Sequence, residues 1–492
     1  MLHDYLIEAA RRAPDKVALV CGHERLTYAE LDARSNALAH RLAAGGVERG
    51  DRAIVFADNT VETVIAFWAV LKANAVVSIV NPLTKSDKLA YLLNDCRPSA
   101  LISEPRLEPV FRAPAAACPH LKSVIVGGLT GSEAAPPPRR ALDIDLAAIV
   151  YTSGSTGDPK GVMLTHRNML AACASVKTYL EIVSDDVIVN ALPLAFDYGL
   201  YQMIMAFAAG ARLVLERSFA YPAQVLKRMA EERVTGFPGV PTIFALLGEP
   251  GSLDAYDLSS IRYVTNTAAA LPEKHIDLLQ KLFPQARIYS MYGLTECKRC
   301  TYLPPADLAR KPGSVGIAIP NTELWIVDEH DRRVGPGVVG QLVIRGATVM
   351  KGYWEKPEAT ARKLKPGPLP GESVLHTGDY CRLDEDGYLY FVGRMDDVIK
   401  SRGEKVAPKE VEMVLMNIPG VREAAVIGVP DPILGQAVKA FVVLETGSDL
   451  AERELRKHCQ SRLENFAVPK YIERVASLPK TVTGKVSKLG LQ

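Results

Sequence analysis

Short runs of β-branched and other apolar residues alternate with longer stretches of helical spacing up to about residue 320. The apolar runs lie at residues 52–56, 75–80, 123–126, 187–189 and 212–215. Apolar residues recur at helical spacing between them, at residues 26–44, 61–74 and 222–233. This alternation predicts α/β units whose sheets are largely parallel.

The pattern changes at about residue 323. Short strands with Gly and Asp turns nearby, at 323–327, 340–345 and 387–392, predict an antiparallel or barrel-like section. After Arg394 the chain has the pattern of a small α+β unit, with helices near 408–417 and 450–462 and strands at 424–428 and 439–443.

We therefore expect an α/β protein with two domains. A large N-terminal domain, residues 1–394, would contain α/β layers with parallel-rich sheets and the small barrel-like section. A small, mobile α+β C-terminal domain would span residues 396–492, with the boundary at residues 394–397.

Three further segments bear on the cellular location of the protein and on its surface connections. The N-terminus resembles a short amphipathic helix, and Lys72, Asn74 and Ser78 interrupt the apolar stretch at 64–80, which predicts a buried helix followed by a buried strand. We therefore expect a cytoplasmic protein with no membrane span. Residues 105–144, rich in Pro and Ala, predict a surface connection that contains one strand.

Composition and charge narrow the range of partners. The 492 residues are 48% apolar and 23% charged, which excludes a mainly disordered chain. The net charge of +2 gives no electrostatic case for a nucleic-acid or anionic-membrane partner, so any recognition of phosphate must be local. The eight cysteines are scattered, and Cys297 and Cys300 are interpreted as ordinary thiols because no second pair accompanies their C-x-x-C spacing.

A loop rich in hydroxyls and glycines carries the strongest chemical signal. It reads Tyr151-Thr-Ser-Gly-Ser-Thr-Gly-Asp-Pro-Lys-Gly161 and follows an apolar strand at 147–150. Glycines let backbone N–H groups approach a phosphate, the hydroxyls add donors, and Lys160 adds a positive charge. The loop is not a Walker A motif, because Pro159 precedes the lysine. The candidate nucleotide-binding residues here are Thr152, Ser153, Gly154, Ser155, Thr156, Gly157 and Lys160.

This loop resembles that of the adenylate-forming (AMP-binding) superfamily, which includes acyl-CoA synthetases, peptide-synthetase adenylation domains and luciferases. Four further segments match motifs of that family in the same order: Met291-Tyr-Gly-Leu-Thr-Glu296, His376-Thr-Gly-Asp379, Gly393-Arg-Met-Asp-Asp-Val-Ile-Lys400 and Pro479-Lys-Thr-Val-Thr-Gly-Lys485. The resemblance covers about residues 20–490. It implies activation of a carboxylic acid by ATP to an acyl-adenylate, followed by transfer to a thiol.

The resemblance also implies roles for the nucleotide-binding residues. Asp379 would accept hydrogen bonds from the ribose hydroxyls, and Arg394 would face the same ribose or the phosphates. Tyr292 would lie against adenine, and Thr295 would donate to the α-phosphate. Glu296 would help to hold Mg²⁺.

The C-terminal motifs imply catalysis and motion. Among the neighbouring lysines Lys480, Lys485 and Lys488, the family motif selects Lys485 as the catalytic cation that bridges the carboxylate and the α-phosphate. Asp396 would be the hinge about which the small domain rotates between the two half-reactions. Gly403 would face the channel for the phosphopantetheine thiol.

The acid-binding segment leaves the substrate open. Phe196-Asp197 matches the position where amino-acid-activating members have Phe-Asp and many acyl- and aryl-CoA ligases have Phe-His. Asp197 would then bind a substrate ammonium, because a carboxylate in an apolar pocket is costly unless it is paired. The alternative is an alkyl or aryl acid, with Asp197 hydrogen-bonded to local backbone. Ala269, in the small-residue segment 265–272, would help to form the floor of the pocket.

The sequence also leaves open the acceptor of the acyl group and two competing functions. The chain ends seven residues after Lys485, so we expect a free-standing ligase that delivers its acyl group to CoA or to a separate carrier protein. The competing hypotheses are an oxidative adenylator of the luciferase kind and a non-catalytic binding protein. His166 and His376 lie in motif segments and are interpreted as structural histidines.

Overall fold

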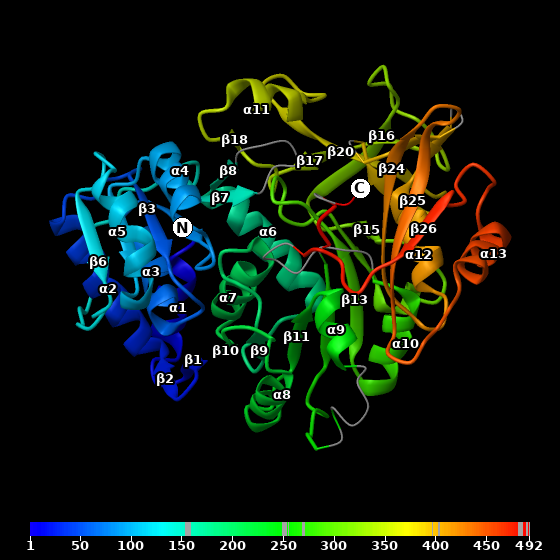
Figure 1. The fold of residues 1–492 in the computed structure, drawn as a ribbon. Coiled ribbons are helices and arrows are strands. Elements are labelled where there is room, and N and C mark those ends of the chain that lie inside the picture. The colour runs from blue at the N-terminus through cyan, green and yellow to red at the C-terminus, as the bar shows by residue number, and fades with distance from the viewer. Residues whose placement is uncertain are drawn as a thin grey trace.

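The computed structural model describes residues 1–152, 159–247, 253, 255–267, 271–395, 397–401, 404–480, 486–488 and 491, apart from the side chains of residues 400, 405 and 435. The fold consists of two large sheets, whose strands alternate in blocks along the chain, a smaller antiparallel sheet and a C-terminal α+β unit (Figure 1). This arrangement confirms the predicted α/β class with parallel-rich sheets.

The larger of the two main sheets has the strand order β15-β14-β13-β12-β11-β9-β10-β1-β2. Its central strands are parallel, and antiparallel pairs occur only toward its two edges. The strands are β1 (Val17–Cys21), β2 (Glu24–Thr27), β9 (Val187–Asn190), β10 (Arg212–Leu215), β11 (Gly236–Gly239), β12 (Tyr263–Asn266), β13 (Arg287–Tyr292), β14 (Thr301–Leu303) and β15 (Ile317–Ala318).

The second main sheet has the order β18-β8-β7-β4-β3-β5-β6. Strands β7, β4, β3, β5 and β6 run parallel, and β8 and β18 are added antiparallel at one edge. The strands are β3 (Arg52–Phe56), β4 (Val76–Val80), β5 (Ala100–Ser103), β6 (Ser123–Val126), β7 (Leu146–Thr152), β8 (Lys160–Thr165) and β18 (Gly352–Tyr353).

Two almost completely buried helices lie between the main sheets. Helix α3 (Val61–Lys72) packs on β3 and β4, and α7 (Asp197–Ala209) packs on β9 and β10. They meet where the Trp68 ring lies 5.7 Å from the Phe207 ring. Both helices are mainly apolar around their circumference, as is typical of helices in a protein core. The other helices of this part are α1 (Asp4–Arg12), α2 (Tyr28–Ala44), α4 (Ser86–Cys96), α5 (Glu108–Ala116), α6 (His166–Leu180), α8 (Pro222–Glu231), α9 (Pro241–Leu247) and α10 (Glu273–Leu282), with 3₁₀ turns at Pro105–Leu107 and Pro305–Asp307.

One prediction about this part was wrong. The segment 105–144 contains helix α5 in addition to the expected strand β6, so it is more than a surface connection. Pro109 lies in the first turn of α5, where a missing N–H costs nothing, and alanine is the strongest helix former. Phe111 packs with Leu89 and Leu93 of α4 in a core cluster beside the second sheet.

The antiparallel section follows β15, as predicted, and β18 of the second main sheet lies between its strands β17 and β19 in sequence. Its order is β16-β17-β20-β19, and β21 also pairs with β20. The strands are β16 (Thr322–Val327), β17 (Gly340–Gly346), β19 (Leu364–Pro366), β20 (Ser373–Leu383) and β21 (Leu389–Arg394), and α11 (Pro357–Lys363) precedes β19. Asp379 lies within the long strand β20.

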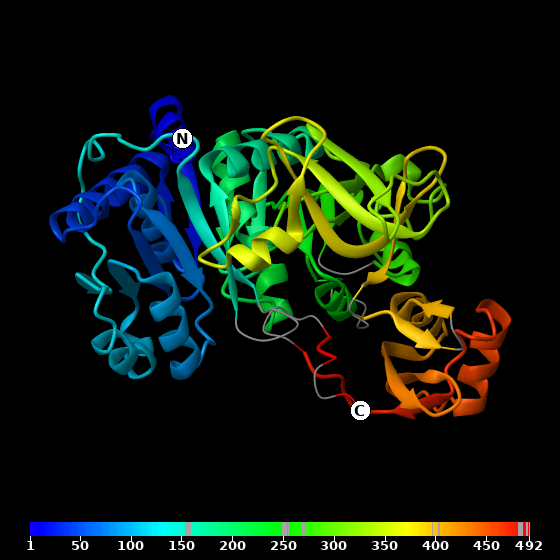
Figure 2. The same ribbon diagram turned by 90° about the horizontal axis from the view of Figure 1, so that it is seen from above.

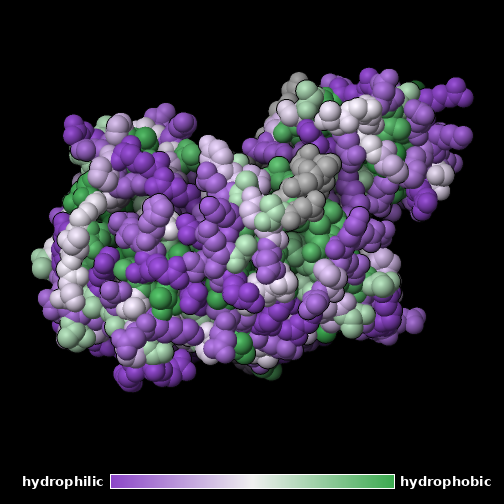
Figure 3. All heavy atoms as spheres, turned by 90° about the horizontal axis from the view of Figure 1, so that it is seen from below, coloured by the Kyte–Doolittle hydropathy of each residue, from purple (hydrophilic) through white to green (hydrophobic). Residues whose placement is uncertain are grey.

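The C-terminal unit has a hydrophobic core of its own. It comprises β22 (Ile399–Ser401), β23 (Glu404–Val406), α12 (Pro408–Met416), β24 (Val421–Asp431), β25 (Gly435–Leu444), α13 (Glu452–Arg462) and β26 (Tyr471–Arg474). Seen from above, this unit lies beside the rest of the molecule (Figure 2), and from below it stands out as a separate, largely hydrophilic lobe (Figure 3). The Lys274 ammonium of α10 donates a hydrogen bond to the Val421 carbonyl oxygen at 2.7 Å, which joins the two parts.

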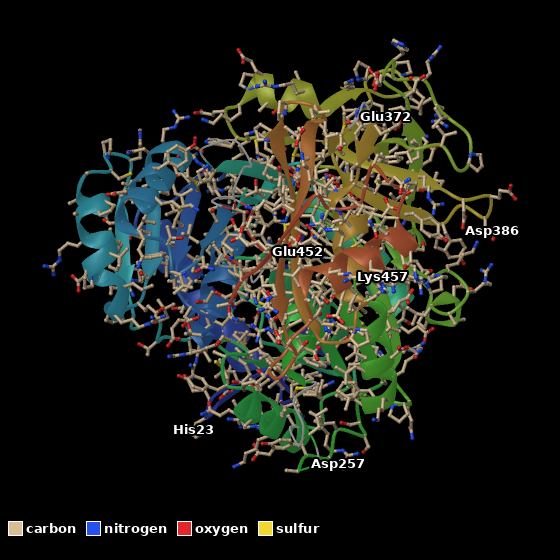
Figure 4. All side chains as sticks on the ribbon, turned by 45° about the vertical axis from the view of Figure 1, so that its right-hand side comes forward. His23, Asp257, Glu372, Asp386, Glu452 and Lys457 are labelled. Carbon is tan, nitrogen blue, oxygen red and sulfur yellow. The ribbon has the colours of Figure 1, made fainter. Side chains whose placement is uncertain are left out.

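The polar face of α13 lies on the outside of this unit. Glu452 and Lys457 are seen there in front of the ribbon (Figure 4). Within the part of the chain that the structure describes, no helix combines the length and the apolar character needed to cross a membrane.

Candidate active site

A β-hairpin supports the loop rich in hydroxyls and glycines. Strands β7 and β8 pair antiparallel, with Thr152 opposite Lys160. The Tyr151 hydroxyl donates to Asp95 Oδ2 at 2.7 Å, and Tyr91 donates to the Pro159 carbonyl oxygen at 3.1 Å. Helix α4, which carries Tyr91 and Asp95, therefore fixes both ends of the loop. Its middle residues, Ser153, Gly154, Ser155, Thr156 and Gly157, lie outside the described residues.

Three of the predicted nucleotide-binding residues lie together. The Tyr292 hydroxyl, at the end of β13, donates a hydrogen bond to Asp379 Oδ2. Asp379 is opposite Arg394 in the pairing of β20 with β21, and the Arg394 Nε lies 3.7 Å from Asp379 Oδ1. The Tyr292 ring is 5.7 Å from that of Phe391 at an interplanar angle of 36°. The end of β13 in the larger main sheet and the antiparallel section thus meet at the Asp379 carboxylate.

Burial gives these groups unusual acidities. Burial raises the pKa of Asp379, although the hydrogen bond from Tyr292 and the charge of Arg394 oppose the rise. The pKa of Tyr292 is well above its ordinary value, because of burial first and the neighbouring Asp379 charge second. The Asp379 carboxylate is consequently an acceptor that gains from additional hydrogen-bond donors, such as a pair of hydroxyls.

Glu296 lies close to this cluster and to the hairpin. Its Oε1 accepts a hydrogen bond from the Tyr353 hydroxyl at 2.7 Å, and its backbone carbonyl accepts one from Met350 N–H at 2.7 Å. The Lys160 ammonium lies 5.7 Å from the centroid of the Tyr353 ring. Tyr353 thus connects the end of the loop with Glu296, and it is a site residue that the sequence reasoning missed. Thr295 is half-buried beside Glu296 in the same turn.

Asp197 has a partner within the chain itself. The Lys298 ammonium donates to the Asp197 carbonyl oxygen at 2.6 Å and lies 3.4 Å from its Oδ2. The Lys298 side chain is 2% exposed and that of Asp197 is 11% exposed, so the ion pair is buried. The same ammonium lies 4.0 Å from the centroid of the Tyr201 ring. Burial lowers the pKa of Lys298 to about 7, and the charge of Asp197 opposes this shift.

The backbone explains how Lys298 reaches this position. Lys298 has a φ of 63°, in the left-handed region, which turns the chain back toward β13. A Cβ at Gly293 would lie 2.5 Å from the Lys298 carbonyl oxygen, so only glycine admits this close approach.

The surroundings of Asp197 are otherwise apolar or aromatic. Phe196 precedes α7, and its ring lies 6.5 Å from the Tyr198 ring. The Tyr198 hydroxyl is 2.6 Å from Thr265 Oγ1, which ties the start of α7 to the end of β12. Asp197 also borders a small pocket between the two main sheets, whose other lining residues are Val77, Ile79, Ala148, Ile149, Val150, Leu194, Ala195 and Leu200.

Cys297 and Cys300 flank Lys298 and Arg299. Both thiols are buried, and their sulfur atoms lie 2.7 Å apart as free cysteines. Burial raises the pKa of Cys297 well above its ordinary value, which disfavours the reactive thiolate. Among the described residues, no three His, Cys, Asp or Glu side chains are grouped so that they could hold a metal ion.

Several predicted residues cannot be placed. Ala269, Asp396, Gly403 and Lys485 lie outside the described residues. The two lysines near Lys485 are described, and both are engaged in ion pairs. Lys480 lies 2.8 Å from Glu423 Oε1, and Lys488 lies 2.8 Å from Glu412 Oε1.

The two motif histidines are both buried. His166 Nδ1 accepts a hydrogen bond from Leu2 N–H at 3.2 Å, and its ring meets that of His3 edge to face. Burial lowers the pKa of His166 to about 4 and that of His3 to about 3. His376 Nδ1 lies 3.6 Å from Asp331 Oδ1. His166 therefore docks the N-terminus, in agreement with its interpretation as a structural histidine.

Sequence reasoning also passed over the two cations between the cysteines. Lys298 and Arg299 are both 2% exposed. The available signal was their position between two cysteines, directly after the Glu296 motif. Which acidic group each would meet was not visible from the local pattern.

Known proteins share both parts of this architecture. Residues 6–354 match the family described as AMP-binding enzyme, and residues 410–485 match the AMP-binding enzyme C-terminal domain. A feruloyl-CoA synthase of Amycolatopsis sp is 35% identical over 490 residues, which cover 99% of this chain and 97% of that protein. A long-chain-fatty-acid–CoA ligase of Bacillus subtilis (strain 168) is 32% identical over 528 residues, with 99% and 93% covered.

Solved structures agree with these sequence similarities. The anthranilate CoA ligase AuaEII in complex with anthranoyl-AMP superposes with a TM-score of 0.91 at 29% identity, covering 99% of this chain and 95% of that one. ATP-bound MatB from Rhodopseudomonas palustris has a TM-score of 0.90 at 29% identity, covering 99% and 98%. The order of the motifs, the fold and these similarities over almost the whole length together show that the chain belongs to the AMP-binding enzyme family.

Proposed function

We propose that this protein is an AMP-forming acid–thiol ligase that converts a carboxylic acid without an amine into its CoA thioester. In the first step a carboxylate oxygen bonds to the α-phosphorus of ATP, and the bond to pyrophosphate breaks. In the second step the sulfur of CoA bonds to the acyl carbon, AMP leaves with the carboxylate oxygen, and the thiol proton is released to solvent. The observation that carries the reaction is the convergence of Tyr292, Asp379 and Arg394 beside the hairpin that holds Lys160.

The nucleotide roles follow from this convergence. Asp379 would accept the ribose hydroxyls, and Tyr292, fixed by its hydrogen bond to Asp379, would lie against adenine. Arg394 would face the ribose or the phosphates, and Thr295 would donate to the α-phosphate. The loop residues 152–157 and Lys160 would hold the phosphates.

Glu296 fits a magnesium site. Its Oε1 is held by Tyr353, and the described residues form no larger cluster of metal-binding side chains around it. Mg²⁺ usually takes one or two protein carboxylates and completes its shell with water and phosphate oxygens. When bound, the ion would supply charge neutralisation for the triphosphate.

Catalysis would depend on a residue of the small C-terminal unit. Lys485 would bridge the attacking carboxylate and the α-phosphate. Its two neighbours are less suited, because Lys480 and Lys488 already pair with Glu423 and Glu412. Rotation of residues 396–492 about Asp396 would remove Lys485 and bring Gly403 to the thiol channel.

The buried pair of Asp197 and Lys298 supports an acid without an amine. An ammonium on the substrate would need the Asp197 carboxylate, and Lys298 already supplies a cation to it from within the chain. A second cation at the same carboxylate would meet the charge of Lys298 in a buried site, which is unfavourable. The acceptor is proposed to be CoA because the feruloyl and long-chain-fatty-acid relatives carry CoA in their names.

One exchange assay tests this function. Purified protein with ATP, Mg²⁺ and labelled pyrophosphate is supplied with matched acids, such as an α-amino acid and its desamino analogue. We expect exchange with amine-free acids and a mass corresponding to the acyl-CoA once CoA is added. A preference for the amine-bearing acid would contradict the substrate proposal. Absence of exchange with every acid would favour a non-catalytic protein, and an oxidised product would favour the luciferase-like alternative.

A further inference from the structure

Arg299 is a buried cation with no carboxylate partner among the residues that the structure describes. Its side chain is 2% exposed, and its Nε is buried without a hydrogen-bond partner. Within the described part of the chain, no carboxylate forms an ion pair with it. A buried guanidinium is normally paired, because removal of its charge from water is costly.

The nearby acidic group is already used. Asp197 pairs with Lys298, the residue directly before Arg299, so two cations and one anion are buried together here. The charge of Arg299 also lowers the pKa of three neighbouring phenols, Tyr179, Tyr198 and Tyr201, but burial outweighs this effect. Burial raises the pKa of all three phenols, that of Tyr198 to about 12, so they are neutral near pH 7 and none supplies the missing anion. When Lys298 is protonated, one positive charge therefore has no carboxylate partner among the described residues.

Arg299 lies on the acid-binding side of the site. Its guanidinium carbon is 5.0 Å from the centroid of the Tyr198 ring, which belongs to the residue directly after Asp197. The Tyr198 hydroxyl contacts Thr265 at the end of β12. A Cβ at Gly293 would lie 3.0 Å from the Arg299 Cα, so the backbone of Arg299 packs against the chain directly after Tyr292. The carboxyl ends of the parallel strands β12 and β13, where α/β proteins bind ligands, thus border this cation.

We propose that Arg299 binds a second anionic group of the substrate, so that the preferred acid is a dicarboxylic acid. One carboxylate of the substrate is adenylated. The other pairs with the Arg299 guanidinium, whose planar shape suits a carboxylate that accepts two parallel hydrogen bonds. This inference rests on the proposed ligase function and specifies its substrate class. An Arg299 that only packs on the Tyr198 ring would give no preference for a second charge.

The test uses pairs of substrates that differ by that charge alone. Pyrophosphate exchange is measured with α,ω-dicarboxylates from malonate to suberate and with the benzenedicarboxylates, each against its half-amide. For the best diacid we expect kcat/KM to exceed that of its half-amide by about 10- to 100-fold, the range for a hydrogen bond to a charged group. Equal values for the two members of each pair, or a preference for the half-amides, would overturn the inference.

Two variants assign the preference to this residue. Arg299→Met has a similar length without charge and should remove the preference for the diacid, while Arg299→Lys should keep part of it. Because Asp197 keeps Lys298 as its partner, Arg299→Met leaves no orphan anion, and we expect its urea midpoint to be equal to or higher than that of the wild type. An unchanged diacid preference in Arg299→Met, or a large loss of stability, would show that Arg299 is a structural cation.

The assay separates the failure of this inference from failure of the ligase function. Exchange with monocarboxylic acids but with no diacid would refute the role of Arg299 and leave the ligase function standing. Absence of exchange with every acid would refute both.

Discussion

Lys298 neutralises Asp197 from within the chain, with its ammonium 2.6 Å from the Asp197 carbonyl oxygen and 3.4 Å from the carboxylate. The two residues are 101 positions apart and come from different elements, the start of α7 and the turn after β13. This contact changes the interpretation of the acid pocket, because the carboxylate that suggested an amino-acid substrate already has its cation.

Asp197 and Lys298 should be strongly coupled in their effects on the free energy of unfolding. Lys298→Met would leave a buried carboxylate without its partner, and we expect a loss of about 3–5 kcal/mol in the free energy of unfolding. The double variant Asp197→Asn/Lys298→Met should recover much of this loss. Urea denaturation of the wild type, both single variants and the double variant measures the coupling. Additive losses would mean that the pair is not a unit.

The same pair predicts how Asp197 affects catalysis. Asp197→Asn should lower kcat/KM by similar factors for an amino acid and for its desamino analogue, because the side chain supports Lys298 and does not bind an amine. Exchange kinetics on the matched acids provide the measurement. A loss confined to the amino acid, on the order of 10- to 100-fold, would restore the amine-binding role.

The contact between Tyr292 and Asp379 predicts an effect on ATP binding. Tyr292→Phe removes a hydrogen bond to a buried carboxylate, so we expect KM for ATP to rise about tenfold. Because that hydrogen bond lowers the pKa of Asp379, its loss should also shift the acidic limb of kcat/KM for ATP to higher pH. Tyr390→Phe, on β21, is a matched control. An ATP KM unchanged in Tyr292→Phe would argue against the nucleotide role.

The three C-terminal lysines should behave differently. Lys485→Ala should reduce acyl-adenylate formation by about 10²- to 10³-fold or more, as loss of transition-state charge stabilisation does. Thioester formation from a supplied acyl-adenylate should persist. Lys480→Ala and Lys488→Ala remove partners of Glu423 and Glu412 and should leave the ratio of the two half-reactions unchanged. Equal loss of both half-reactions in Lys485→Ala would refute its role or the domain rotation.

The hinge can be tested separately. Asp396→Pro fixes φ near −65° and should restrict rotation of the C-terminal unit, so one half-reaction should fall far more than the other. Single-turnover assays of adenylation and of thioester formation measure this difference. If neither rate changes, Asp396 is not the pivot.

The buried histidines predict a loss of stability in acid. The pKa of His166 is about 4 in the folded protein against an ordinary value of 6.5, so the unfolded chain binds a proton first as the pH falls. The contribution of neutral His166 to the free energy of unfolding is complete above pH 6.5. It is lost as the pH falls from 6.5 to about 4, by up to about 3 kcal/mol. His166→Asn retains an acceptor for Leu2 N–H and does not titrate, so its unfolding free energy should fall less steeply over this range. An equally steep fall of the unfolding free energy with pH in the wild type and in His166→Asn would contradict this prediction.

The sequence by itself determined the layers and the order of the motifs. Runs of apolar residues with periods of two or of 3.6 are local properties, and strands β3, β6 and β10 begin and end where the pattern indicates. The residue types of the loop after β7 indicated phosphate binding, and the resemblance to the adenylate-forming superfamily identified the segments that contain Tyr292, Asp379 and Arg394. Helix α5 was missed because its prolines suggested a connection, although one of them lies in the first turn, where a helix tolerates it.

Only the tertiary structure decided which of these residues meet. Tyr292 and Asp379 are 87 positions apart, and their hydrogen bond exists because the antiparallel sheet packs at the end of β13. Lys298 reaches Asp197 because a left-handed turn and Gly293 allow the chain to fold back on itself. The charge balance of a buried site depends on such distant pairs, and local patterns carry no information about them. Packing therefore determined that Asp197 has a partner and that Arg299 has no carboxylate partner among the described residues.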